Sequence, residues 1–218
     1  LILVLILWLF LSLISTSTLA LSSDWVFNDK SKVRLISSKN SVDNVNQIVL
    51  GLEYELEPGW KTYWKSPGGG GFPQKIIWDN STNIKDITID WPTPKEFEIL
   101  GLSSLGYEDK VIFPLLVKLY DSNKTTVVNL NTNYLVCKDI CIPGNANLLL
   151  EIQPGTGEYS EFFHEIEKTR SLLPIENINL SSLYKLDTKI EKYSDKIEIK
   201  VIAESDSSFI NTNIFLHT

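Results

Sequence analysis

The feature that most constrains this fold is a series of short runs in which apolar and polar residues alternate. Between residues 47 and 56, most apolar side chains stand at every second position, which is typical of a strand with one buried face. Similar runs follow, separated by Pro, Gly, Asn and Asp, at residues 76–78, 87–91, 111–119, 126–130, 134–137 and 148–152. No helices are indicated between these runs. Residues 24–153 are therefore predicted to form an all-β, antiparallel sandwich, and a thioredoxin fold is disfavoured.

The pattern changes after residue 153. Apolar residues between 155 and 174 fall at helical spacing, and Pro174 provides a stop, so residues 154–174 are predicted to be a linker with one short helix. Alternation then returns at residues 186–190 and 197–201, with a turn between them, which predicts a β-hairpin. We interpret residues 175–218 as the start of a second β domain that the sequence truncates.

The N-terminal stretch has the character of a targeting segment. Its first 14 residues are almost entirely apolar and uncharged, and small residues follow up to Ala20. Because a membrane-spanning helix needs about 20 apolar residues, residues 1–22 are predicted to be a secretory signal peptide whose own N-terminus is incomplete. A buried core helix or an uncleaved anchor is the alternative. Export would place the cysteines where disulfides form.

Charge and composition exclude several functions. The 20 basic and 27 acidic residues give a net charge of −7, without a basic cluster, so no nucleic acid is expected as a partner. The glycine run at residues 68–71 lacks the following Lys-Ser/Thr of a nucleotide-binding loop. With two histidines and no Gly-x-Ser-x-Gly, a serine hydrolase is unsupported. No cofactor is expected.

Cys137 and Cys141 are the only cysteines in the chain, and they stand four positions apart at the end of a predicted strand. A disulfide that closes so small a loop stabilises a fold by only about 2 kcal/mol, compared with about 3 kcal/mol for a 15-residue loop. Such a loop also keeps two reduced sulfurs near each other, which suits reversible exchange. Spacing alone leaves open a redox-active pair, a structural disulfide and a metal site.

Metal binding by the two cysteines has little further support. Two thiolates can hold Cu(I), but the chain contains no methionine, and zinc would need four ligands. The histidines are His164, on the predicted linker helix, and His217, near the end of the sequence. No metal site is therefore assigned.

Several separated motifs, in this order, resemble the N-terminal periplasmic domain of the DsbD/ScsB protein-disulfide reductases, and the ScsB (suppressor of copper sensitivity) branch most closely. The resemblance extends over residues 24–153. It rests on Trp-Lys-Thr-Tyr-Trp at 60–64, Pro-Gly at 67–68, Gly-Phe-Pro at 71–73, Trp-Pro-Thr-Pro at 91–94, Gly-Tyr-Glu-Asp at 106–109, and Tyr-Leu-Val-Cys-Lys-Asp-Ile-Cys-Ile-Pro at 134–143.

Membership of this family implies an immunoglobulin-like sandwich in a Gram-negative periplasm, tethered to the inner membrane. The full-length protein would add a transmembrane electron-carrying domain and a thioredoxin-like domain as partners. Cys137 and Cys141 would be the redox pair of a protein-disulfide reductase, passing electrons to periplasmic client proteins that contain disulfides, with a link to copper tolerance. The alternative is a periplasmic Cu(I)-binding or purely structural β-sandwich domain.

The family resemblance also implies a cap over the sulfurs. Residues 97–107 occupy the place of the cap loop in sequence order, and two prolines before them predict a long irregular loop. We expect Leu100 and Leu102 to shield the sulfurs, with Tyr63 at the rim of the site. The glycine run beside Tyr63 is predicted to be a flexible loop.

Overall fold

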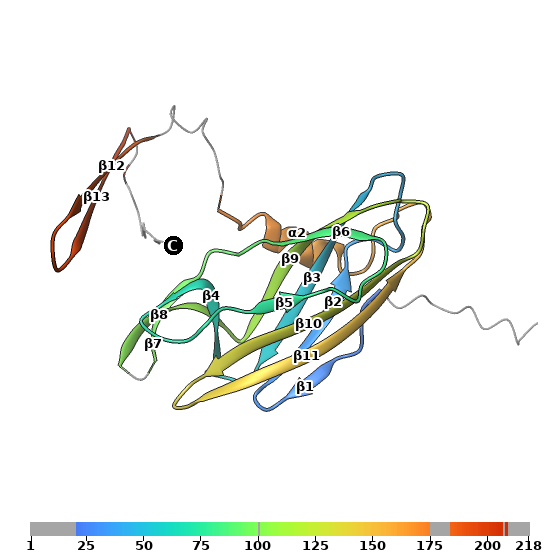
Figure 1. The fold of residues 1–218 in the computed structure, drawn as a ribbon, viewed down its shortest axis with the longest axis horizontal. Coiled ribbons are helices and arrows are strands. Elements are labelled where there is room, and N and C mark those ends of the chain that lie inside the picture. The colour runs from blue at the N-terminus through green and yellow to red at the C-terminus, as the bar shows by residue number, and fades with distance from the viewer. Residues whose placement is uncertain (1–20, 100, 175–183, 207, 209–218) are drawn as a thin grey trace, which may run out of the picture. The chain divides into compact units, whose positions relative to one another are not determined.

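The computed structural model describes residues 21–99, 101–174, 184–206 and 208, and this part of the chain is mostly β (Figure 1). It divides into two compact units, one that ends at Leu173 and one that begins at Pro174. All but the last two residues of the predicted signal peptide lie outside the described residues. Among the described residues, no helix is long and apolar enough to cross a membrane.

The first unit contains two antiparallel sheets. Five strands form one sheet in the order β1-β2-β3-β9-β6. They are β1 (Val26–Asn28), β2 (Ser31–Ser37), β3 (Gln47–Leu56), β9 (Lys110–Leu119) and β6 (Ile84–Ile89). The prediction for residues 47–56 is confirmed to the residue, because nearly every side chain of β3 that alternation directs inward is apolar and buried.

The second sheet carries the cysteines. It has the order β11-β10-β4-β8-β7, and β5 pairs with another part of β10. Its strands are β4 (Lys61–Gly68), β5 (Lys75–Ile77), β7 (Lys95–Ile99), β8 (Leu102–Glu108), β10 (Thr126–Cys137) and β11 (Cys141–Ile152). β7 and β8 form a hairpin at the same end of the unit as the turn between β10 and β11 (Figure 1).

The core of this unit lies between the two sheets. Tyr54 of β3 meets Tyr134 of β10 edge to face, with ring centroids 4.9 Å apart, and the Tyr54 hydroxyl shares a hydrogen bond of 2.8 Å with Thr132. Thr132 is fully buried, so a polar residue occupies an inward position of β10. This explains why residues 126–137 resemble two short strands in the sequence although they form a single one.

One prediction about secondary structure was wrong. The segment after the two prolines is not an irregular loop, since residues 95–99 and 102–108 pair as the hairpin β7–β8. Its outward positions are occupied by Ser and Glu, while Gly106 faces the carbonyl of Thr62 so closely that a Cβ would come within 2.0 Å of it. These small and polar residues at the edge of the sheet hide the alternation on which strand prediction depends.

The predicted linker helix is confirmed as α2 (Phe163–Arg170). Its residue Ile166 is fully buried against Ile36 and Ile112, on the face of the first sheet that looks away from the second. In the second unit, β12 (Tyr184–Lys192) and β13 (Ile197–Ser205) confirm the predicted hairpin. The rest of the predicted second domain, residues 175–183 and most residues after 206, lies outside the described part of the chain.

Candidate redox site

The disulfide closes the end of the longest hairpin in the first unit. Cys137 is the last residue of β10, Cys141 is the first residue of β11, and the two are register partners with Cα atoms 4.1 Å apart. Residues 138–140 make the turn, in which the amide of Lys138 donates to the carbonyl of Ile140 at 3.0 Å. Twelve pairs of register partners therefore bring the cysteines opposite each other, and they form the expected disulfide.

The two cysteines differ sharply in exposure. Cys137 is 0% exposed, whereas Cys141 belongs to the exposed residues at the start of β11. A nucleophile in solution can therefore approach Cys141 but not Cys137. This asymmetry gives the two sulfurs different chemical roles in any exchange reaction, because attack on a disulfide requires access in line with the S–S bond.

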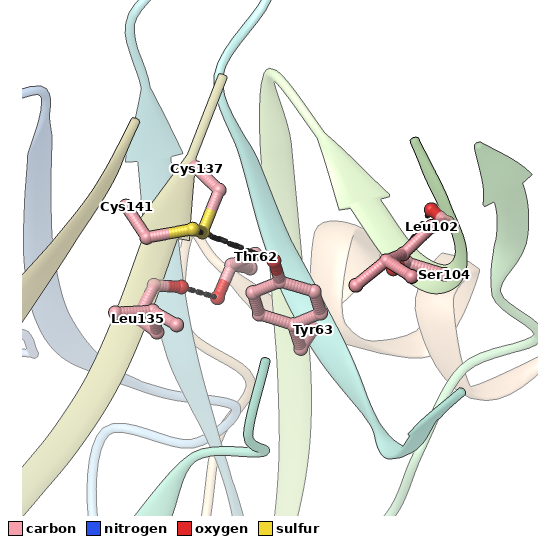
Figure 2. Close-up of a disulfide and its surroundings, with 7 residues drawn as sticks. All are labelled: Thr62, Tyr63, Leu102, Ser104, Leu135, Cys137 and Cys141. Atoms are coloured by element: carbon pink, nitrogen blue, oxygen red, sulfur yellow. Dashed lines mark hydrogen bonds between the residues drawn. A yellow bond between two sulfur atoms is a disulfide. The ribbon is translucent and has the colours of Figure 1, made fainter. Parts of the chain in front are cut away.

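Tyr63 covers the buried sulfur. β4 pairs with the end of β10 through Thr62 and Lys61, and this pairing places the next residue, Tyr63, beside the disulfide. Its hydroxyl donates to Sγ of Cys137 at 3.0 Å and lies 3.9 Å from Sγ of Cys141 (Figure 2). Burial raises the pKa of Tyr63, so its phenol keeps its proton and remains a hydrogen-bond donor at neutral pH.

The cap hairpin, defined here as β7 and β8, supplies further cover. Ile99 is buried in one apolar cluster with Tyr63 and Cys137, and Phe97 packs against that cluster with its ring centroid 6.5 Å from that of Tyr63. The segment was predicted to be the cap, but neither Phe97 nor Ile99 was predicted to be a covering residue. The signal was present, because both residues fall on one face of a short alternating run.

The leucines expected to shield the sulfurs are placed differently. Leu100 lies outside the described residues. Leu102, at the start of β8, is 47% exposed and lies on the far side of Tyr63 from the disulfide (Figure 2). Its side chain covers the backbone of Gly69 and Gly70, where added Cβ atoms would stand 3.4 and 3.2 Å from it. Any shielding by Leu102 is therefore indirect.

Charged groups near the disulfide are held by other partners. Lys61 lies 3.3 Å from the carboxylate of Glu108 and 5.6 Å from the centre of the Phe97 ring. Lys138, in the turn itself, donates to the carbonyl of Pro58 at 3.4 Å. Within the described part of the chain, no three His, Cys, Asp or Glu side chains gather where they could hold a metal ion. The groups that contact the sulfurs are thus a phenol and apolar side chains.

A β domain with a disulfide at a hairpin end, one accessible sulfur and one covered sulfur is consistent with the class of thiol-disulfide exchange domains. Comparison with protein families matches residues 33–152 to the family described as "Thiol:disulfide interchange protein DsbD, N-terminal". The match spans more than half of the sequence, and the chain belongs to this family.

Two solved structures were found to be similar to the chain. The N-terminal periplasmic domain of ScsB from Proteus mirabilis matches with a TM-score of 0.59 and 23% identity, covering 85% of this chain and 86% of that one. The reduced N-terminal domain of DsbD from Neisseria meningitidis matches with a TM-score of 0.32 and 12% identity, covering 57% of this chain and 86% of that one. The first match shows the same fold, and the second is too weak to support an argument. No curated protein matches the chain.

Proposed function

We propose that this chain is the thiol-disulfide exchange module of a periplasmic protein-disulfide reductase, and that Cys137 and Cys141 carry the electrons. The observation that supports the proposal most strongly is the contrast between an exposed Cys141 and a buried Cys137 whose sulfur accepts a hydrogen bond from Tyr63. A purely structural disulfide needs neither an accessible sulfur nor a donor beside the other one.

In the first step, a thiolate of the electron-donating partner attacks Sγ of Cys141. The S–S bond breaks, a mixed disulfide forms between the partner and Cys141, and Cys137 leaves as a thiolate. The Tyr63 hydroxyl, 3.0 Å from that sulfur, is placed to stabilise the new negative charge. The second thiolate of the partner then attacks the partner's first sulfur, which is the one bonded to Cys141. This forms a disulfide within the partner and releases Cys141 as a thiolate, so two electrons have passed to the pair.

The second half of the cycle runs in the opposite sense. The thiolate of Cys141 attacks a disulfide of a client protein, and one client sulfur leaves as a thiolate. Cys137 then attacks Sγ of Cys141, which releases the second client sulfur and restores the disulfide. The client gains the two electrons that the pair loses, and solvent supplies the protons that its thiolates take up.

The remaining parts of the proposal concern the full-length protein. Family membership supports an immunoglobulin-like class for the first unit, with the β12–β13 hairpin opening a second β domain. It also supports a periplasmic location, with transmembrane and thioredoxin-like domains of the same protein as electron donors. The link to copper tolerance rests on the resemblance of the sequence motifs to the ScsB branch.

The equilibrium reduction potential of the pair tests the proposal. We would measure it on the purified chain from Ser22 onward, by thiol labelling in a series of glutathione or dithiothreitol buffers. A potential of roughly −120 to −270 mV, the range of known exchange proteins, is the expected result. A potential below about −300 mV would indicate a structural disulfide that resists reduction, and the reductase function would have to be withdrawn.

A further inference from the structure

The glycine segment, defined as residues 68–71, lies between two side chains of the redox site. On one side, Leu102 of the cap hairpin packs on Gly69 and Gly70. On the other side, the backbone of Gly71 lies directly on the ring of Tyr63. The segment therefore contacts both Leu102 and Tyr63.

No residue with a side chain can replace Gly71 unless neighbouring atoms move. Its φ is +87°, a left-handed conformation that side chains with a Cβ disfavour. A Cβ at this position would stand 2.3 to 2.5 Å from three atoms of the Tyr63 ring. Because a phenol ring is rigid, any side chain at Gly71 must displace either the ring or the segment.

Both ends of the glycine segment are fixed. The amide of Gly69 donates to the carbonyl of Ser103 in the cap hairpin at 2.9 Å. Beyond the segment, the buried side chain of Gln74 donates to Oγ1 of Thr62 at 2.8 Å, next to Tyr63 in β4. The segment is thus attached to the cap at one end and to the strand that carries Tyr63 at the other.

We infer that the glycine segment is the middle layer of a two-layer cover over the disulfide, and that Gly71 is a positioning residue that holds the Tyr63 hydroxyl on Sγ of Cys137. The outer layer is the tip of the cap hairpin, where Leu102 presses on the segment. The inference rests on the proposed function only in treating the cysteines as a pair that is reduced and reoxidised.

Replacement of Gly71 by alanine tests the inference. In Gly71→Ala, the pKa of the Cys137 thiol in the reduced protein should rise by about one pH unit or more, because the added Cβ displaces the phenol that stabilises the thiolate. The matched control is Gly157→Ala, which adds a Cβ at a φ of +71° and within 2.5 Å of Asp43, beyond the opposite end of β11. This control should lose comparable stability and keep the thiol pKa of the wild type.

Two further variants keep the test decisive. Leu102→Ala removes the outer layer without backbone strain at a half-exposed position, and it should also raise the pKa of the Cys137 thiol, even if Gly71→Ala fails to fold. The effect of Gly71→Ala on the pKa of the Cys137 thiol should be lost when Tyr63→Phe is already present, because both changes remove one hydrogen bond.

A wild-type pKa of the Cys137 thiol in both Gly71→Ala and Leu102→Ala would overturn the inference. Full additivity of Gly71→Ala and Tyr63→Phe in the thiol pKa would do the same. Failure of the proposed function is a separate result, because a disulfide with a potential below about −300 mV could still show these differences in thiol pKa.

Discussion

The Tyr63 hydroxyl is 3.0 Å from Sγ of Cys137 but 3.9 Å from Sγ of Cys141, so its proton serves the buried sulfur rather than the exposed one. A hydrogen bond from a neutral donor is stronger when the acceptor is charged. The contact therefore stabilises a Cys137 thiolate more than it stabilises the disulfide.

Tyr63→Phe should consequently raise the pKa of the Cys137 thiol by about one to two pH units and make the reduction potential more negative. The pH dependence of thiolate absorbance in the reduced protein measures the first effect. Tyr54→Phe is the matched control, since it also removes a buried hydroxyl that shares a hydrogen bond with a side chain, in the core between the sheets. An unchanged thiol pKa in Tyr63→Phe would show that the hydrogen bond does not act on the thiolate.

Single cysteine variants should reveal the different exposure of the two sulfurs. In Cys137→Ala, the remaining Cys141 thiol should react with a thiol reagent at least about tenfold faster than the Cys137 thiol does in Cys141→Ala, because accessible thiols react selectively. In denaturant the two rates should become similar, which is the control. Faster reaction of Cys137 in the folded protein would reverse the assignment of the attacked sulfur.

Removal of an aromatic ring from the cap hairpin should expose the disulfide. Phe97→Ala takes away a ring that packs on Tyr63 and Cys137, so reduction by dithiothreitol should accelerate several-fold, with a loss of stability of about 1–2 kcal/mol. Phe27→Ala is the control, because Phe27 is 74% exposed on β1. Equal acceleration in both variants would mean that Phe97 does not cover the site.

The part of the fold that sequence predicted well is the part where one face of a strand is buried and the other is not. β3 and β11 alternate in burial and α2 has helical spacing, so hydrophobic periodicity identified them, whereas β9 was recognised as a nearly continuous apolar run. The cap hairpin was missed because its first strand is only five residues long and its second has Ser104 and Gly106 at buried positions, which interrupts the apolar alternation.

The site was predictable in its cysteines but not in its cover. Two cysteines four positions apart at a strand end identify a disulfide from sequence alone. The cluster that brings Phe97 and Ile99 to Cys137 joins residues about 40 positions apart, and only the pairing of β4 with both β8 and β10 brings them together. Periodicity within a segment carries no information about such pairing.

Helix α2 should be a stabilising element that is independent of the redox chemistry. Its Ile166 is buried against Ile36 and Ile112, and Lys110 of β9 links Glu165 of the helix, at 2.9 Å, to the buried carboxylate of Glu53, at 2.6 Å. Ile166→Ala should lower the free energy of unfolding by about 2–4 kcal/mol without changing the reduction potential.

Denaturant unfolding and the potential measured on the same samples check this prediction. Leu172→Ala, just after the helix at a 61% exposed position, should have little effect on stability and serves as the control. A shifted potential in Ile166→Ala would mean that the helix communicates with the disulfide.

Alkaline pH should unfold the first unit cooperatively. Burial raises the pKa of four tyrosines above the usual value of about 10: Tyr54, Tyr63, Tyr107 and Tyr134. Above pH 10 the unfolded chain loses these protons while the folded chain keeps them, so the free energy of unfolding falls by up to about 1.4 kcal/mol per pH unit for each tyrosine.

Tyrosinate absorbance and circular dichroism, followed together during a pH titration, measure this effect. The tyrosinate of the buried residues should form in the same transition in which the β signal is lost, and Tyr54→Phe should make the decline in stability less steep. Ionisation of all eight tyrosines in a fully folded protein would contradict the expectation.

Because Cys137 and Cys141 are register partners at the end of a hairpin with twelve paired positions, the backbone already holds them together before any bond joins their sulfurs. Breaking that bond releases only a five-residue loop, so the oxidised and the reduced domain should share one fold and differ in stability by no more than about 2 kcal/mol. The module would then be an electron carrier with a small reorganisation energy. The free energy of each transfer would depend on the chemistry of the two sulfurs and on the side chains that cover Cys137, and not on refolding of the domain.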